Sequence, residues 1–442
     1  MLWNPATVSP KRRRIAELAR QSPEMAFTSL AHLMDIDWLH EAYRLTRKSG
    51  AVGVDGQSAG EYAVNLESNL RSLLDRAKSG TYQAPPVRRV HIPKGSGHET
   101  RPIGIPTFED KVLQRAVLMV LEPMYEQDFL DCSYGFRPRR SAHDALDSLR
   151  KQVIANRGGW ILEMDIRKCF DTLDHGHLRE FLQRRVRDGV LLRLLGKWLK
   201  AGVLEDGGVS YPEAGSPQGG VVSPLLANIY LHEVLDRWFE RDVKPRMRGR
   251  AFLIRFADDA VLGFASRADA LRVLEVLPKR FGKYGLTVHP DKTRLVPFLR
   301  PPQGGRQGTR PGTFPFLGFT HYWGRSREGY WVMKRKTASD RLRRALHAIA
   351  DWCRHHRHLS VRDQHATLCQ KMRGHYEYYG MTGNSRSLSS FRFGCIHIWR
   401  KWLSRRHRQG LMPWSRYERL LARYPLARVV VVHSVYRRVA NP

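Results

Sequence analysis

The stretch AFLIRFADDAVLGF, residues 251–264, consists of two apolar runs separated by Ala257-Asp258-Asp259. Runs of this length predict two buried β-strands, and the polar interruption predicts a hairpin tip between them. The stretch WILEMDI, residues 160–166, predicts another buried strand that ends on a carboxylate, Asp165. If these strands are neighbours in one sheet, Asp165, Asp258 and Asp259 meet at one end of it.

Carboxylates that converge from separate strands suit hard divalent cations. Nucleotidyl transfer uses two such ions, about 4 Å apart, at the attacking and leaving oxygens. Ligands that are all oxygen favour Mg²⁺, and we expect two Mg²⁺ ions, with Mn²⁺ able to substitute. An Asp-Asp pair in a turn is also ordinary turn chemistry, so the dipeptide alone decides little and the surrounding motifs carry the interpretation.

The segments around these strands alternate between helical and extended patterns. Thr107 and Asp110 resemble a capping box at the start of a helix with a wide apolar face. Residues 301–312 are rich in Pro, Gly, Gln and Arg, which predicts a flexible insertion or linker. The remaining patterns predict a helix over residues 35–48 stopped by Gly50, a strand over 87–93, a Gly-rich turn at 94–97, a turn at 215–220, and helices over 191–200, 221–235 and 341–353.

The charge of the chain predicts a polyanionic partner. The formal net charge is +33, and residues 301–442 hold 28 Lys or Arg against 6 Asp or Glu, a net +22. Aromatic residues interleave with these arginines, and stacking combined with positive charge is how RNA and single strands are held. We therefore expect the last third of the chain to bind nucleic acid.

Other classes of protein are disfavoured by composition. The five cysteines are far apart and never form a C-x-x-C pair, so neither a disulfide framework nor a zinc site is indicated. No run of eighteen apolar residues predicts a membrane span. The basic cluster at residues 11–14 lacks the apolar segment of a signal peptide, so we expect a cytoplasmic protein.

Seven short motifs occur in order along nearly the whole chain, and together they resemble the reverse transcriptases encoded by bacterial group II introns, the intron maturase family. Each motif alone is modest evidence, whereas seven in register are specific. They are GVDG (53–56), IPK (92–94) with RPIGIPT (101–107), SYGFRP (133–138), DIRKCFD (165–171), SPQG (216–219), FADD (256–259) and FLG (316–318).

The resemblance implies an α+β fold: a right-hand polymerase with fingers, a palm built on an antiparallel sheet, and an α-helical thumb. RGHYEYYG (373–380) and GNS (383–385) resemble the maturase-specific part of that thumb. The implied domains are an N-terminal extension at 1–50, fingers and palm at 51–300, the end of the palm with the primer grip at 301–330, the thumb at 331–390, and a basic nucleic-acid-binding region at 391–442.

The resemblance also implies roles at the nucleotide site. Lys94 and Arg101 would clamp the triphosphate of the incoming nucleotide, and Gln218 would line its pocket. Phe170 would be the steric gate that rejects ribonucleotides, although a core Phe is the plain alternative. Lys292 would lie near the pyrophosphate, and a solvated surface lysine is an equally open interpretation. The implied metal ligands are Asp165, Ile166, Asp258 and Asp259; the implied nucleic-acid contacts are Arg137, Arg373, Tyr376, Arg405, Arg406 and Arg408.

Two departures from the family pattern qualify these expectations. Phe256 stands where the family usually has Tyr, which leaves metal binding intact but removes a hydroxyl beside the catalytic pair. Many members also carry a Cys- and His-bearing endonuclease, and the sequence up to Pro442 contains none, so we do not expect this chain to nick a DNA target.

The expected partners are an RNA template, a DNA or RNA primer, deoxynucleoside triphosphates and a group II intron RNA. Two alternatives stay open: a domesticated bacterial reverse transcriptase in phage defence, a retron or DNA repair, and a splicing cofactor that binds RNA without polymerising. Intron RNA domains flanking the reading frame would favour the maturase. An RNA-dependent RNA polymerase is disfavoured by the bulk of Phe170. The resemblance implies the bacterial cytosol or nucleoid as the location of the protein. The oligomeric state is not predicted.

Overall fold

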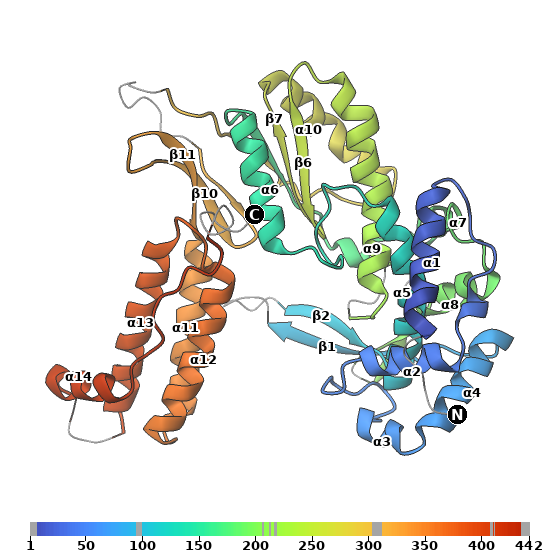
Figure 1. Cartoon of the computed structure of the whole chain (residues 1–442), viewed down its shortest axis with the longest axis horizontal. Coiled ribbons are helices and arrows are strands. Elements are labelled where there is room, and N and C mark those ends of the chain that lie inside the picture. Colours follow the sequence, from blue (N-terminus) through green and yellow to red (C-terminus); the bar gives the residue numbers. More distant parts are fainter. Residues whose placement is uncertain are drawn as a thin grey trace. The chain divides into compact units, whose positions relative to one another are not determined.

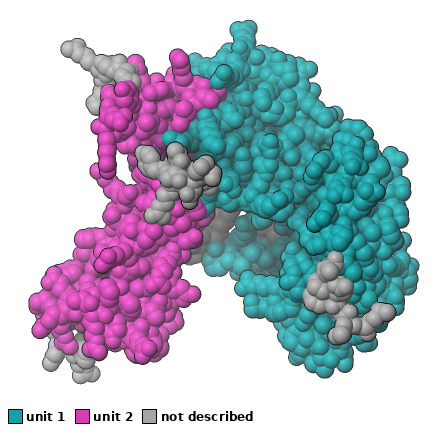
Figure 2. Space-filling model, in the orientation of Figure 1, with its two compact units in different colours: residues 1–152, 159–295 teal, residues 153–158, 296–442 magenta. Residues whose placement is uncertain are grey.

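The computed structural model describes residues 7–93, 100–205, 207–211, 214–215, 219–302, 312–406, 410 and 412–434. The chain forms two compact units, the first made of residues 1–152 and 159–295 and the second of residues 153–158 and 296–442 (Figure 2). Within the described residues, no helix is long and apolar enough to cross a membrane. Helices and strands occur in both units, so the predicted mixed α+β class is confirmed.

The first unit is organised around one long buried helix, α5 (Phe108–Asp128), which confirms the predicted apolar helix after Thr107. The side chain of Thr107 accepts a hydrogen bond from the backbone N–H of Asp110, at 3.2 Å. The other half of the predicted capping box is wrong, because the Asp110 carboxylate accepts from Tyr82, Gln114 and Trp198 instead. The preceding helices are α1 (Val8–Gln21), α2 (Ile36–Leu45), α3 (Ala59–Val64) and α4 (Leu66–Ser79).

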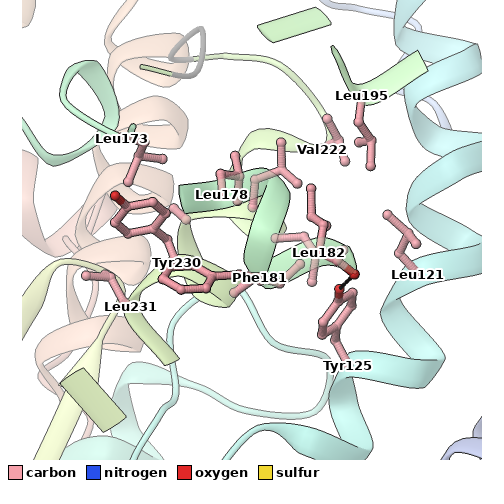
Figure 3. Close-up of a cluster of buried hydrophobic side chains, with 14 of the residues drawn as sticks. Leu121, Tyr125, Leu173, Leu178, Phe181, Leu182, Leu195, Val222, Tyr230 and Leu231 are labelled. Carbon is pink, nitrogen blue, oxygen red and sulfur yellow. Dashed lines mark hydrogen bonds between the residues drawn. The ribbon is translucent and has the colours of Figure 1, made fainter. Parts of the chain in front are cut away.

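Helix α2 begins where predicted, since the Asp35 carboxylate accepts from the Trp38 N–H. It ends at Leu45, however, earlier than the predicted stop at Gly50. Further along, α7 (His175–Gln183) and α9 (Ser223–Leu231) pack against α5 through a cluster of buried apolar side chains (Figure 3). In that cluster the Tyr125 hydroxyl donates to the Leu182 carbonyl at 3.5 Å.

A small sheet with strand order β2-β1-β4-β5 belongs to this unit. The predicted strand over 87–93 is confirmed, and it pairs antiparallel with β2, placing Ile92 opposite Arg101. The Gly-rich turn predicted at 94–97 lies outside the described residues. The strands are β1 (Val87–Pro93), β2 (Thr100–Ile105), β4 (Val203–Glu205) and β5 (Gly208–Ser210); α8 (Gly189–Leu199) precedes β4 and confirms the predicted helix there.

The second sheet of this unit has strand order β6-β7-β3-β8, and β7 pairs antiparallel with both β6 and β3. The hairpin predicted over residues 251–264 is confirmed (Figure 1). The helix predicted over 221–235 begins at Ser223 and continues beyond α9 as π-helical turns, η4 (His232–Asp236) and η5 (Phe239–Val243). The strands are β3 (Trp160–Met164), β6 (Ala251–Phe256), β7 (Asp259–Phe264) and β8 (Arg294–Pro297); the nearby helices are α6 (Ala142–Ala155) and α10 (Arg267–Gly282).

The second unit joins a three-stranded sheet to a helical bundle with its own apolar core. The helix predicted over residues 341–353 is confirmed and extends further at both ends. Most of the predicted linker, residues 303–311, lies outside the described residues. The elements are β9 (Phe314–Phe316), β10 (Phe319–Arg325), β11 (Trp331–Thr337), α11 (Ser339–His355), α12 (Val361–Tyr379), α13 (Ser385–Ser404) and α14 (Trp414–Arg423).

Candidate active site

The register of two neighbouring strands brings the acidic residues together. Met164, the last residue of β3, is opposite Ala260 in β7, so Asp165 follows beside the hairpin tip. Phe256 pairs with Asp259, which leaves Ala257 and Asp258 as the two tip residues. Paired strands are about 4.8 Å apart. The half-buried Asp165 and Asp258 and the exposed Asp259 therefore share one end of the sheet.

A segment on the other side of Asp165 completes its surroundings. The His289 N–H donates to the Asp165 carbonyl at 2.8 Å, and the Arg167 N–H donates to the Thr287 carbonyl at 2.9 Å. This pairing carries Lys292 toward the site, where its Nζ lies 3.3 Å from Asp165 Oδ2. The ammonium group is thus next to one of the carboxylates that the sequence assigns to metal binding.

The donor set of this site fits Mg²⁺ in chemistry but is incomplete in number. Its side-chain donors are carboxylate oxygens, which Mg²⁺ prefers. Among the described residues, no group of three or more His, Cys, Asp or Glu side chains is arranged to hold a metal ion. Magnesium usually takes only one or two protein carboxylates and fills its octahedron with water and phosphate oxygens. The residues present therefore fit an ion that is bound together with a nucleotide.

The backbone of the hairpin tip is held in an unusual conformation. Ala257 has a φ of 56°, in the left-handed region that costs a residue with a Cβ roughly 1 kcal/mol. Gly135 packs directly against it, because an added Cβ would lie 2.2 Å from the Ala257 nitrogen. The Gly135 carbonyl accepts a hydrogen bond from Asn228 Nδ2 at 2.8 Å, and this bond holds Gly135 in place against the tip. The SYGFRP motif therefore serves as a support for the tip.

A buried arginine connects the hairpin tip to neighbouring elements of the unit through hydrogen bonds. Arg255 is fully buried, and its guanidinium forms an ion pair with Asp236 through Nε at 2.7 Å and Nη2 at 2.6 Å. It also donates to Asn228 Oδ1 at 2.9 Å, to Ser133 Oγ at 2.8 Å, and to the Ala257 carbonyl at 3.0 Å. One side chain thus links the η4 turn, the SYGFRP motif and the tip itself.

Arg255, Asp236 and Asn228 were not singled out from the sequence, and Ser133 was named only as part of the SYGFRP motif. One signal was available, because a charged residue inside an apolar strand such as AFLIRF must be paired if the strand is buried. That signal would have marked Arg255. It could not have identified Asp236 as the partner, since the two are nineteen residues apart in different elements.

The residues assigned to the nucleotide are placed only in part. Phe170 is 8% exposed and belongs to the main apolar core, while Arg101 is exposed on β2. Lys94 and Gln218 lie outside the described residues. Beside Phe170, burial raises the pKa of the Cys169 thiol, and the negative charge of Asp258 raises it further, so this thiol stays neutral.

The last residue of the SPQG motif and the residues after it are fixed to neighbouring elements. Gly219 has a φ of 117°, and an added Cβ would lie 2.3 Å from the Gly104 carbonyl of β2. The Val221 N–H donates to Gln114 Oε1 at 2.7 Å, and Gln114 Nε2 donates to Asp110. Burial raises the pKa of Asp110 to about 6. A chain of polar contacts thus connects α5 to Val221, three residues after Gln218 in the sequence.

The proposed nucleic-acid contacts differ widely in exposure. The Arg137 side chain is 3% exposed and pairs with Glu126 at 3.0 Å, and Tyr376 is 2% exposed in the core of unit 2. In this structure both stabilise the fold and neither faces solvent. Arg373 and Arg405 are exposed, and the Arg405 guanidinium lies 4.9 Å from the Trp402 ring. Arg406 donates to the Leu359 carbonyl, and Arg408 lies outside the described residues.

Comparison with known proteins defines the class. The family described as reverse transcriptase (RNA-dependent DNA polymerase) matches residues 92–321, about half of the chain. The chain belongs to this family. It is therefore an RNA-dependent DNA polymerase by class, and that class implies the right-hand polymerase fold.

Individual relatives make the relation more specific. The chain is 37% identical over 328 residues to protein YkfC of Escherichia coli (strain K12), covering 65% of this chain and 84% of that protein. It is 40% identical over 225 residues to the group II intron-encoded protein LtrA of Lactococcus lactis subsp. cremoris, covering 50% of this chain and 37% of that protein. It is 32% identical over 181 residues to nuclear intron maturase 2, mitochondrial, of Arabidopsis thaliana, covering 32% of this chain and 24% of that protein. The resemblance to group II intron-encoded reverse transcriptases is thus confirmed.

Proposed function

We propose that this chain copies RNA into DNA by two-metal nucleotidyl transfer and assists the splicing and mobility of a group II intron. The observation that carries the polymerase part is the pairing of β3 with β7, which puts Asp165 beside the tip that bears Asp258. The relation to an intron-encoded protein supports the intron part. The test is primer extension on an RNA template, with and without the partner intron RNA.

In this proposal each residue has a distinct task. Asp165 and Asp258 bind the ions, with Asp259 and the backbone of Ile166 as further ligands. When bound, two divalent ions would activate the primer hydroxyl and neutralise the leaving pyrophosphate. Lys94 and Arg101 hold the triphosphate, and Gln218 lines the nucleotide pocket. Lys292, which pairs with Asp165, is placed to interact with the negative charge of the leaving pyrophosphate.

The proposed sugar gate gives a first prediction. Phe170→Ala should raise incorporation of ribonucleotides relative to deoxyribonucleotides, because removal of the ring opens space at the 2′ position. A pocket that distinguishes two substrates by one small group changes the ratio of their kcat/KM values by about 10- to 200-fold, and we expect a change of this order. The measurement is the ratio of kcat/KM for a ribonucleotide and its deoxy counterpart on one RNA template.

Because Phe170 also belongs to the core, this test needs a control with a matched loss of packing. Phe181, buried in the same core, provides it. Phe→Ala in a core lowers the free energy of unfolding by about 3–5 kcal/mol. Phe181→Ala should therefore destabilise the protein without changing sugar selection. Equal selection by Phe170→Ala and the parent would leave Phe170 as a core residue and place the gate elsewhere.

The proposed intron contacts give a second prediction. Replacing Arg405, Arg406 and Arg408 with Gln should flatten the salt dependence of intron RNA binding, by about 0.7 to 0.9 units of log–log slope for each phosphate that the variant no longer binds. Arg272→Gln, an exposed arginine on α10, is the control for loss of charge. Affinity is measured across a salt series. If plots of log affinity against log salt concentration for the parent and the triple variant are parallel and share one intercept, the proposed role in intron binding is contradicted. The proposed polymerase activity would not be affected by that result.

A further inference from the structure

A surface pocket of about 410 Å³ lies on unit 2, between α13 and the chain that follows α14. That chain runs back along the helices (Figure 1). It is held there because the Tyr376 hydroxyl donates to the Ala427 carbonyl at 3.4 Å and the His433 N–H donates to the Gly380 carbonyl at 2.8 Å. The pocket volume is within the range of about 300–1,000 Å³ typical of ligand sites. Its lining residues are Ser389, Arg392, Phe393, Ile396, Arg428 and Val429.

A row of flat side chains extends from this pocket along α13. Phe393, His397 and Arg400 are spaced i, i+4 and i+7, so they share one face of the helix. The rings of Phe393 and His397 are 4.0 Å apart, and the rings of His397 and Trp414 are 5.1 Å apart. The Arg400 guanidinium lies 4.0 Å from the Trp414 ring. Four flat groups thus follow one another on the surface.

This row is preformed and open to solvent. Phe393 is 64% exposed and Trp414 is 41% exposed, although both are large and apolar. Arg400 is fixed by donating to the Met412 carbonyl at 2.9 Å and 2.7 Å. The Tyr417 hydroxyl donates to the Ile396 carbonyl at 2.8 Å, which holds α14 against α13. The fold thus leaves most of Phe393 open to solvent, together with the part of Trp414 that Arg400 does not cover.

The charge around the pocket identifies the chemistry of an occupant. Two of the described lining residues are arginines and none is acidic. Arginine guanidiniums form short, charge-assisted and often bidentate hydrogen bonds with phosphate oxygens. Aromatic faces beside arginines are the platform on which bases of unpaired strands stack.

We propose that the row formed by Phe393, His397 and Trp414, with the pocket that contains Arg392 and Arg428, binds an unpaired segment of RNA. Bases stack on the exposed rings and phosphates meet the two guanidiniums. Bases in a duplex already stack on one another, so the rings select an unpaired strand. RNA is the expected strand because the family copies RNA. The inference rests on the proposed binding of RNA by unit 2 and adds the residues and the unpaired state of the RNA.

The test is binding of a fluorescent, unstructured twelve-nucleotide RNA by the full chain in EDTA without nucleotides. Phe393→Ala should weaken binding by at least about five-fold, since one base–aromatic stack is worth about 1–3 kcal/mol. Phe393→Trp should restore it. Arg392→Gln combined with Arg428→Gln should lower the salt slope by about 1.4, because each phosphate bound on a single strand contributes about 0.7.

The matched controls come from the surface of unit 1, at two residues to which no nucleic-acid contact is assigned. Tyr211 is 72% exposed and Arg272 on α10 is exposed, so Tyr211→Ala and Arg272→Gln remove a similar ring and a similar charge. Equal losses of affinity for Tyr211→Ala and Phe393→Ala, or an unchanged slope in the arginine variant, would overturn the proposal. Equally weakened binding of duplex RNA would overturn the stacking, and tighter binding of single-stranded DNA would overturn the choice of RNA. Failure of polymerisation does not affect this readout, since no chemistry occurs in EDTA.

Discussion

Asp258→Ala is expected to slow RNA-templated nucleotide addition by at least about 10³-fold, because a metal site supplies several kcal/mol of transition-state stabilisation and each 1.4 kcal/mol is tenfold. The variant removes one of the two half-buried carboxylates at the end of the sheet. Binding of template and primer should change little, since the arginines that we assign to nucleic acid are untouched. The measurement is single-nucleotide addition in Mg²⁺ beside an equilibrium binding assay.

The control for this variant is another carboxylate near the same site. Asp291 is exposed and adjacent to Lys292, so Asp291→Ala removes a nearby negative charge without removing a proposed ligand. Its rate should stay within about two-fold of the parent, which is less than 0.5 kcal/mol. The rate of nucleotide addition by Asp259→Ala should lie between the rates of Asp258→Ala and Asp291→Ala, because Asp259 is exposed at the start of β7. Parental rates for Asp258→Ala in Mg²⁺ would refute the two-metal proposal.

The strands and the β6–β7 hairpin could be predicted because local patterns determine them, whereas the pairing of β3 with β7 entered the prediction only as a condition. The two apolar runs of residues 251–264 are too short for separate helices, and the polar tip between them breaks the pattern where the chain turns. The same reasoning found α5, whose apolar face is continuous. It failed at Asp110, where three buried partners compete with the capping role and only the tertiary structure brings them close.

The carboxylates that we propose as metal ligands could be predicted from the sequence, whereas the side chains that support the hairpin tip could not. Asp165 directly follows the buried strand β3 and Asp258 lies at the tip between β6 and β7, so both reach one end of the sheet once these strands pair. Arg137 carries the same charge as a surface arginine, yet its side chain is buried and donates to Glu126 and to two backbone carbonyls. Sequence gives the charge of a residue, whereas its role here depends on an acidic partner eleven residues away.

The support of the hairpin tip leads to the second large expected effect. Arg255→Lys should lower the turnover of nucleotide addition by about 10²-fold, because a displacement of about 1 Å in the reacting geometry has an effect of that size. Lysine keeps the positive charge beside Asp236 but has three donors where arginine has five. It cannot therefore serve Asp236, Asn228, Ser133 and the Ala257 carbonyl together.

The effect of Arg255 on the stability of the fold must be separated from its effect on the position of the hairpin tip. Asp236→Asn leaves a buried guanidinium without its counter-ion, which should lower the free energy of unfolding by about 3–5 kcal/mol. Replacing the pair together, Arg255→Met with Asp236→Leu, removes both charges, and such exchanges are often neutral or stabilising. Urea denaturation of the three variants gives their free energies of unfolding.

The paired variant decides between the two roles of the network. If Arg255 positions the tip, Arg255→Met with Asp236→Leu regains most of the free energy of unfolding while turnover stays low, because the Ala257 carbonyl and Ser133 then have no donor from residue 255. The KM for the nucleotide should change less than kcat, since Arg101, which is assigned to the triphosphate, belongs to β2 in the other sheet of the unit. If turnover returns with stability, the ion pair stabilises the fold only and Ala257 is held by Gly135 and the β6–β7 register alone.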